Sequence, residues 1–271
     1  MTGRLQDKVA IITGAGSGIG ESISLAFARE GAHIVGAARR VERLQEVAKK
    51  VQALGTRFVA IRCDVTVKDN CQNVAAETMK EFGKIDILVN NAAYFPVKRF
   101  LGITTDEWDA VMATNLKGTM LMCQAVLPHM VPQKRGKVLM LNSTQSRMAL
   151  FHQDHYAVSK AGLIGLTRCL AAEFGPKGIN VNGFNCGYTP ETEGATRVAL
   201  DSIVAKFGPD VSEEVKTNML KGADELNMAY QAIKRLARVD DYDGIAVFLA
   251  SDESDFITGQ TIPVDGGSVM P

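Results

Sequence analysis

Short apolar runs alternate with longer stretches of helical periodicity along most of the chain. The apolar runs predict strands at residues 9–12, 32–35, 58–62, 85–89, 137–141 and 179–184. Between them, apolar residues recur every three or four positions, which is the spacing of an amphipathic helix. This spacing predicts helices at 19–30, 41–54, 68–82 and about 108–127, and a later helix that contains Tyr156. Pro128, Pro132 and Gly136 are expected to break the chain before the next strand.

Strands that alternate with helices predict βαβ units and therefore an α/β fold with a parallel sheet. Because crossovers between parallel strands are right-handed, helices are expected on both faces of the sheet. Ligands in such a fold bind beyond the carboxyl ends of the strands, so the residues just after each strand are the candidates for function. The whole chain, residues 1–271, is expected to form one domain.

Residues 188–235 interrupt this alternation. Two helical patterns fall here, at about 195–207 and 212–230, separated by Gly208 and Pro209. An insertion of this kind predicts a lid over a pocket. Its soft apolar side chains are expected to pack on the body of the protein rather than to line the pocket; they are Met219, Leu226, Met228 and Tyr230.

Charge and composition narrow the range of partners. Lys and Arg together number 30, as do Asp and Glu, so broad binding to nucleic acid or to an anionic membrane is not expected. No apolar stretch is long enough to span a membrane, and charges interrupt the N-terminus where a signal peptide would be apolar. The five cysteines form no CxxC pair and none lies near a His at zinc-ligand spacing. We therefore expect reduced thiols in a cytoplasmic protein without a metal site.

A glycine-rich turn, TGAGSGIG at residues 13–20, follows the first predicted strand. Glycines let a phosphate approach the backbone, and the next helix points free N–H groups and its positive dipole end at that phosphate. Alone, such a cluster would indicate only a flexible turn, but between a strand and a helix it predicts a dinucleotide site. The candidate contacts are Gly14, Ser17, Gly18 and Ile19. No GK[ST] sequence is present, which disfavours a P-loop nucleotide hydrolase.

Arg39 and Arg40 follow the second predicted strand, and no carboxylate accompanies them. In dinucleotide folds, an acidic side chain at this point bonds the ribose 2′-hydroxyl of NAD, whereas an arginine accommodates the 2′-phosphate of NADP. NADP(H) is therefore the preferred cofactor, with NAD(H) as the alternative. The other interpretation is that the two arginines form a solvated surface pair.

Polar residues follow two further strands. Asp64 and Val65 come after the third, where the Asp64 carboxylate either accepts from the adenine amino group or caps the next helix. Asn90 and Asn91 come after the fourth, where asparagine either bonds a ribose or turns the chain.

Tyr156 and Lys160 stand four residues apart in a predicted helix, so they share one face. A desolvated ammonium and the positive charge of an oxidised nicotinamide would lower the tyrosine pKa from about 10 to about 7, which takes roughly 4 kcal/mol. Tyr156 would then take a proton from an alcohol or give one to a carbonyl oxygen. Ser143, just after a predicted strand, would hydrogen-bond the same oxygen. Asn115 lies inside a predicted helix, where asparagine is unfavourable, so it either has a task or faces solvent.

Together these motifs resemble the short-chain dehydrogenase/reductase family over nearly the whole chain. TGAGSGIG is similar to the family's TGxxxGIG turn, and NNAA at 90–93 is similar to its NNAG. The segments FLAS at 248–251, TGQ at 258–260 and VDGG at 264–267 also resemble the family's closing segment. The positions of the family's Asn-Ser-Tyr-Lys tetrad are occupied by Asn115, Ser143, Tyr156 and Lys160.

The resemblance implies a doubly wound Rossmann sheet of about seven parallel strands. It implies that Tyr156 is the general acid/base and that Lys160 lowers its pKa and holds the nicotinamide ribose. It also implies that Ser143 orients the carbonyl and that Asn115 anchors a water in a proton relay. Dimers or tetramers are implied as well, built partly through the helices that carry Asn115 and Tyr156.

Besides Ala93, which replaces the Gly of the family's NNAG, the chain departs from the family pattern in two further places. Ser17 stands where NADP-binding members often carry Lys or Arg, so the NADP prediction rests on Arg39 alone. The family's Pro-Gly after the sixth strand is Cys186-Gly187 here, and Cys186 is expected to be a small buried residue rather than a nucleophile. Just beyond it, Thr189 is the candidate contact to the nicotinamide carboxamide.

Substrate choice is expected from the loops after the strands, namely residues 94–96, residues 145–155 and the lid. Four polar residues in the loop 145–155 either contact a polar substrate or face solvent; they are Gln145, His152, Gln153 and His155.

The predicted function is an NADP(H)-dependent oxidoreductase that interconverts a secondary alcohol and a ketone. A 3-oxoacyl-thioester reductase is the alternative within that class. The alternative from another class is a non-catalytic nucleotide-sensing protein, which would not need all of Ser143, Tyr156 and Lys160.

Overall fold

The computed structural model of the chain describes residues 3–148, 152–208 and 210–270. Its centre is a sheet of seven parallel strands in the order β3-β2-β1-β4-β5-β6-β7, which confirms the predicted doubly wound fold. The strands are β1 (Val9–Thr13), β2 (His33–Ala38), β3 (Phe58–Arg62), β4 (Ile87–Asn90), β5 (Gly136–Ser143), β6 (Ile179–Cys186) and β7 (Thr261–Val264). Parts of two predicted segments, 149–151 in the second pocket loop and 209 in the lid, lie outside the described residues.

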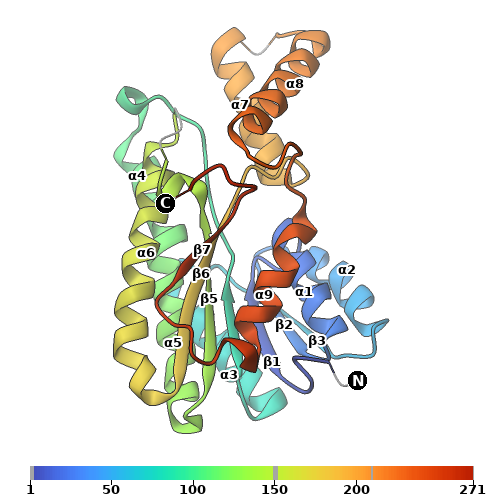
Figure 1. The fold of residues 1–271 in the computed structure, drawn as a ribbon, viewed down its shortest axis with the longest axis vertical. Coiled ribbons are helices and arrows are strands. Elements are labelled where there is room, and N and C mark those ends of the chain that lie inside the picture. Colours follow the sequence, from blue (N-terminus) through green and yellow to red (C-terminus); the bar gives the residue numbers. More distant parts are fainter. Residues whose placement is uncertain (1–2, 149–151, 209, 271) are drawn as a thin grey trace.

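Helices cover both faces of the sheet (Figure 1). One core joins the sheet to α1 (Gly18–Arg29), α2 (Val41–Gln52) and α9 (Asp243–Ala250). The other joins it to α3 (Lys68–Phe82), α5 (Gly118–Gln133) and α6 (Asp154–Phe174). Among the described residues, no helix combines the length and the apolar character that a membrane span requires.

Burial of both faces explains why the inner strands show continuous apolar runs. In β1, Ala10 and Ile12 belong to one core, whereas Val9 and Ile11 belong to the other, because successive strand side chains point to opposite faces. β7 has a different pattern: it pairs only with β6 at the edge of the sheet, is partly exposed throughout, and contains Pro263. The apolar pattern therefore missed this strand.

The expectation that Pro128 and Pro132 break the chain is wrong. The region predicted as one helix consists of α4 (Thr105–Met112), a π-helical turn η2 (Ala113–Lys117) and α5, which includes both prolines. Both prolines are exposed, so water can satisfy the carbonyl groups that their missing N–H groups leave free. Burial of the opposite face of α5 then outweighs the low helix propensity of proline.

The predicted lid helices are present as α7 (Glu193–Phe207) and α8 (Glu213–Tyr230). They project from the body beyond the carboxyl end of β6 and lie beside each other (Figure 1). The expectation that the apolar residues of the lid pack on the body is wrong for Leu226 and Tyr230, which are 57% and 64% exposed. No residue of α8 is buried, because the helix pair stands away from the sheet and its helices.

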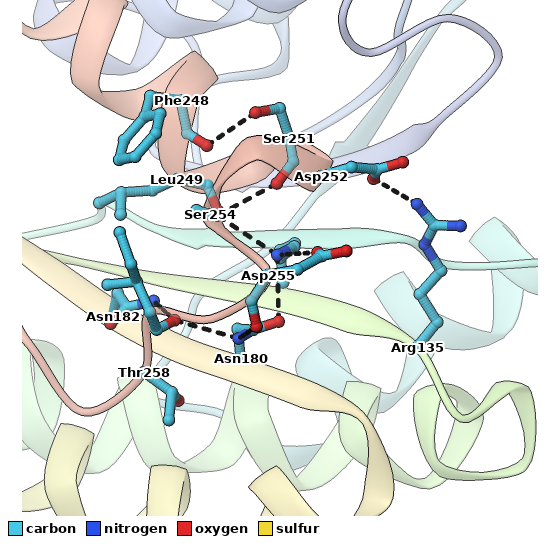
Figure 2. Close-up of polar contacts among 12 residues, drawn as sticks. Arg135, Asn180, Asn182, Phe248, Leu249, Ser251, Asp252, Ser254, Asp255 and Thr258 are labelled. Carbon is cyan, nitrogen blue, oxygen red and sulfur yellow. Dashed lines mark hydrogen bonds and ion pairs between the residues drawn. The ribbon is translucent and has the colours of Figure 1, made fainter.

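At the opposite end of the sheet, a buried ammonium attaches the C-terminal segment to the sheet. Lys137 in β5 is 5% exposed, and its Nζ donates to Asn180 Oδ1 (3.0 Å), Ser254 Oγ (3.2 Å) and Asp255 Oδ1 (2.7 Å). Ser254 Oγ in turn donates to the carbonyl of Leu249, at the end of α9 (3.0 Å; Figure 2). A buried charge is tolerated here because the ammonium donates to three oxygen atoms, one of which belongs to a carboxylate.

Asp255→Asn is expected to lower the free energy of unfolding by about 1–3 kcal/mol, because it leaves the buried Lys137 ammonium without its counter-ion. Asp252→Asn is the matched control, because its partner Arg135 is exposed and such pairs contribute about 0–1 kcal/mol (Figure 2). Urea denaturation of both variants measures the difference. Equal losses in the two variants would contradict the counter-ion role of Asp255.

Candidate active site

The glycine turn between β1 and α1 is held by the residue that follows β4. Gly14 and Gly18 have φ angles of +66° and +58°, in the left-handed region that favours glycine. The Asn91 carboxamide donates through Nδ2 to the carbonyls of Thr13 (2.8 Å) and Gly14 (3.1 Å), and the Asn91 N–H donates to Thr13 Oγ1 (2.9 Å). A Cβ on Gly20 would lie 2.3 Å from the Gly14 carbonyl oxygen, so the backbone here leaves no room for a side chain.

The same turn fits the predicted nucleotide. α1 begins at Gly18, and the Ser17 side chain makes no capping hydrogen bond to it, so the first N–H groups of the helix remain available to an anion. Close by in the fold, at the end of β4, the Asn90 Oδ1 atom is buried without a hydrogen-bond partner among the described residues. The Asn90 Nδ2 atom contacts Cys123 Sγ and Met140 Sδ, so this carboxamide lies on the face of the sheet that α5 covers. The uncapped N-terminus of α1 at a glycine turn by itself suits an anionic phosphate. Contacts from Gly14 and Ile19 to such a phosphate stay a prediction.

Arg39 and Asp64 lie near each other at the ends of β2 and β3. Arg39 is exposed and forms no hydrogen bond or ion pair within the described part of the chain. Burial raises the pKa of Asp64, but the hydrogen bonds from Thr66 and the charges of Arg39 and Arg62 outweigh it, so the net shift is downward. The Asp64 carboxylate thus stays ionised beside a free guanidinium.

Asp64 does not cap the next helix, so that interpretation is wrong. Its Oδ1 accepts from Thr66 N (3.0 Å) and Thr66 Oγ1 (2.7 Å), whereas α3 starts at Lys68 with Val67 as its N-cap. The neighbouring Val65 is buried against Gly118 at the start of α5. The predicted contacts of Asp64 and Val65 to adenine remain untested by this geometry.

The predicted proton-transfer residues meet at the carboxyl ends of β5 and β6. Ser143 is the last residue of β5, and its Oγ accepts from Gln145 N (3.2 Å). Lys160 of α6 is 3% exposed; its Nζ donates to the Leu141 carbonyl (2.7 Å) and lies 5.7 Å from the centroid of the Tyr156 ring. The fold thus brings Ser143, Tyr156 and Lys160 together at the carboxyl ends of β5 and β6.

Burial moves both titrating groups toward their neutral forms. It raises the pKa of Tyr156, and a hydrogen bond with Ser143 offsets only part of that rise. It lowers the pKa of Lys160 to about 8, against a smaller opposing effect of Cys186. The protein's own groups therefore hold the Tyr156 phenol protonated, and the lowering of its pKa by a cationic neighbour stays a prediction.

Asn115 does not face solvent, so that alternative is wrong. It lies in the π-helical turn η2 and is 1% exposed. Its Nδ2 donates to Tyr94 O (2.9 Å) and Ser159 Oγ (3.0 Å), and its Oδ1 accepts from Tyr94 N (2.7 Å). Asn115 therefore ties the loop after β4 to α6, next to Lys160. Its predicted part in a proton relay remains a prediction.

The segment after β6 is fixed by buried hydrogen bonds. Thr189 is 4% exposed; its Oγ1 lies 2.7 Å from Tyr242 Oη and donates to the Gly187 carbonyl (3.1 Å). Its predicted contact to a carboxamide is not tested by these bonds. Cys186 is buried, and burial raises its thiol pKa to about 12 although the charge of Lys160 lowers it. A protonated, buried thiol matches the expectation that Cys186 is not a nucleophile.

The first turn of the lid touches both halves of the site. A Cβ on Gly18 would lie 3.2 Å from Thr192 Cγ2, and a Cβ on Gly194 would lie 2.2 Å from the Phe95 ring. The Phe95 and Tyr156 ring centroids are 5.5 Å apart. Local sequence patterns gave no indication of the Gly194–Phe95 contact, although Phe95 belongs to a loop predicted to line the pocket.

Two of the four polar residues of the second pocket loop are buried, whereas His152 is exposed. Gln153 and His155 are 7% and 0% exposed, so solvation is the wrong interpretation for these two. Gln145 Nε2 donates to Gln153 Oε1, and His155 Nδ1 accepts from Tyr156 N (3.0 Å). This loop supports the start of α6 directly beside Tyr156.

Comparisons with known proteins agree with this geometry. A family model described as short chain dehydrogenase matches residues 8–202, and one described as Enoyl-(Acyl carrier protein) reductase matches residues 211–269. The chain is 36% identical over 272 aligned positions to the oxidoreductase UcpA of Escherichia coli K12, which covers 99% of this chain and 97% of the relative. It is 32% identical over 269 positions to the 3-oxoacyl-[acyl-carrier-protein] reductase FabG of Thermotoga maritima, with 98% and 100% covered. A solved short-chain type dehydrogenase/reductase from Mycobacterium marinum is 31% identical, with a TM-score of 0.85 and 98% and 97% of the two chains covered.

The stability of the protein is expected to rise with pH through Lys160. Folding lowers the pKa of this ammonium to about 8, whereas in an unfolded chain a lysine titrates near 10.4. Between these values the unfolded chain binds the proton and the folded chain does not, so raising the pH favours the folded state. From about pH 7 to about pH 10 this contributes about 2 kcal/mol.

Urea denaturation of wild type and Lys160→Met at both pH values isolates this contribution, because other titrating groups are common to the two proteins. The free energy of unfolding of the wild type should increase relative to that of the variant at the higher pH. A difference between the two proteins that is independent of pH would refute the assignment.

Proposed function

The chain belongs to the short-chain dehydrogenase family, and from this premise we propose that it is an NADP(H)-dependent oxidoreductase that interconverts a secondary alcohol and a ketone. The observation that carries the proposal is the convergence of Ser143, Tyr156 and Lys160 at the carboxyl ends of β5 and β6, where Ser143 and Lys160 are buried and Tyr156 is partly buried. A nicotinamide cofactor, when bound, supplies the hydride donor or acceptor.

The chain's own residues handle the proton and the substrate oxygen. Tyr156 gives the proton of its hydroxyl to the carbonyl oxygen in reduction and takes it back in oxidation. Ser143 hydrogen-bonds the same oxygen and so orients it. Lys160 holds its charge behind the Tyr156 ring, and Phe95 with the first turn of the lid limits the access of water. In this proposal Asn115 fixes the helix that carries Tyr156 and Lys160 and anchors the water of the relay.

The cofactor would lie along the carboxyl ends of β1 to β6. We assign the phosphates to the turn of Gly14, Ser17, Gly18 and Ile19. The remaining contacts are Asp64 and Val65 for adenine, Asn90 and Asn91 for ribose, Tyr156 and Lys160 for the nicotinamide ribose, and Thr189 for the carboxamide. The unpaired Arg39 guanidinium supports NADP(H) over NAD(H), because it is free to accept a 2′-phosphate.

A 3-oxoacyl-thioester reductase is the second candidate, favoured by the relatives that carry that name at 32–34% identity. Both candidates use the same proton-transfer residues and differ in the carbonyl compound. Turnover of an acyl-carrier thioester without turnover of free ketones would favour the second. Binding of the cofactor without turnover of any carbonyl compound would favour a nucleotide-sensing protein instead.

We also propose that the protein forms a homo-oligomer, a dimer or a tetramer, and that it is cytoplasmic. A groove of about 480 Å³ runs between α5 and α6 on the outer side of the molecule. Its lining is mostly apolar, as a surface covered by a second copy would be, and includes Met120, Leu127, Val131, Leu166, Leu170 and Phe174. The five free cysteines, four of them buried, support a reducing compartment.

Tyr156→Phe is expected to lower kcat by about 10²–10⁴-fold, because it removes the proton that reaches the substrate oxygen. Binding of NADPH, followed by calorimetry, should stay near that of the wild type. Turnover retained in Tyr156→Phe would contradict the assignment of Tyr156 as the general acid/base.

Arg39→Ser is expected to raise the KM for NADPH by about tenfold or more, because a charge-assisted hydrogen bond to phosphate is lost. The KM for NADH, which lacks the 2′-phosphate, should change little and serves as the internal control. Steady-state rates followed by nicotinamide absorbance give both constants. An equal change for the two cofactors would count against the role of Arg39.

A further inference from the structure

One carboxylate connects the lid to the arginines that follow β2. Glu193, the first residue of α7, accepts from Arg40 Nη2 (2.9 Å) and from Arg43 Nη2 (3.1 Å). Among the described residues, no other side chain of α7 or α8 forms an ion pair with the body of the protein. These two contacts, the Glu193 pairs, join positions about 150 residues apart in the sequence.

The Glu193 pairs hold the part of the lid that covers the site. Thr192, just before Glu193, packs on Gly18 of the glycine turn, and Gly194, just after it, packs on the Phe95 ring beside Tyr156. Glu193 is thus placed between the two contacts that close the lid. Loss of the Glu193 pairs would loosen both contacts together.

The charges around Glu193 favour competition with a phosphate. Arg39, Arg40 and Arg43 gather at the end of β2 and the start of α2, with Glu193 and Glu46 as the carboxylate partners of Arg43. Glu193 and both its arginines are about half exposed, and an exposed ion pair changes an equilibrium constant by about fivefold at most. A phosphate carries up to two charges and binds guanidinium groups bidentately, so it can displace such a carboxylate.

We propose that Glu193 is a specificity-determining residue that competes with the cofactor's 2′-phosphate for Arg40 and Arg43. A ligand with a 2′-phosphate then frees the first turn of α7, whereas a ligand without it leaves the lid attached. The choice of ligand rests on the proposed function, but the attachment of the lid by Glu193 does not.

Two adenosine compounds without nicotinamide test the competition, because they differ only in the 2′-phosphate: adenosine 2′,5′-bisphosphate and adenosine 5′-monophosphate. Glu193→Gln is expected to tighten binding of the bisphosphate by about fivefold, as removal of an exposed ion pair allows, and to leave the monophosphate unchanged. Glu46→Gln is the matched control: it removes a carboxylate partner of Arg43 that belongs to α2 and not to the lid. It should tighten binding of the bisphosphate less than Glu193→Gln does, because it frees Arg43 alone and leaves Arg40 paired with Glu193.

Hydrogen exchange of the backbone amides in residues 189–200 tests the lid directly. In the wild type, the bisphosphate should increase exchange in this segment and the monophosphate should not. In Glu193→Gln, exchange should already be high without ligand and should not rise further. Glu46→Gln should behave as the wild type.

Three results would overturn the proposal: weaker binding of the bisphosphate to Glu193→Gln, unchanged exchange in that variant, or protection of the segment by the bisphosphate in the wild type. Failure of the bisphosphate to bind the wild type would overturn the NADP(H) assignment and the competition together. Binding without any change in exchange would overturn the competition alone.

Discussion

Burial of the parallel sheet on both faces determines where polar chemistry can occur in this protein. Ile11, Ile12, Leu88 and Val89 are fully buried, so the strands can carry reactive polar groups only toward their ends. At the carboxyl ends, Thr13, Asn90 and Ser143 are the last residues of β1, β4 and β5. At the other end, the buried Lys137 is tolerated only because three oxygen atoms accept from it. The same constraint thus places the candidate site at the carboxyl ends of the strands and a structural polar cluster at their amino ends.

Within the crevice, exclusion of water acts on every titrating group in a consistent direction. It raises the pKa of the Tyr156 and Cys186 side chains and lowers that of Lys160, so each group is driven toward its neutral form. A phenol that keeps its proton is ready to donate it to a carbonyl oxygen. Taking a proton from an alcohol requires additional positive charge near the phenol, and Lys160 behind the ring is the protein's contribution to that charge. The balance between the two directions of the reaction therefore depends on how far water is excluded from the Tyr156 hydroxyl and on how much positive charge lies near it.

Sequence patterns predicted the strands that are buried on both faces and missed the elements that are partly exposed to water. The inner strands are buried on both faces, so their apolar runs were sufficient, whereas β7 is a partly exposed edge strand with Pro263 and resembles a loop. Pro128 and Pro132 indicated a break, because a sequence does not show that both face water on a helix held by its other side. Among the site residues, the proximity of Tyr156 and Lys160 could be predicted from their spacing, because both lie on one helix. The burial of Asn115 depends on a π-helical turn, and the Glu193 pairs depend on residues distant in sequence; neither leaves a local pattern.

Two of the attachments of the lid differ in kind, and this difference matters for its movement. At its base, Thr189 is fixed by buried hydrogen bonds to Tyr242 and Gly187, whose loss would leave unsatisfied groups in the interior. Beside the glycine turn, it is held by exposed ion pairs, each of which contributes about 0–1 kcal/mol. A segment anchored firmly at one point and weakly at another moves about the firm point. Since the weak point lies where an anionic ligand is expected, release at Glu193 would free the first turn of α7 from the glycine turn while Thr189 at the base of the lid stays in place.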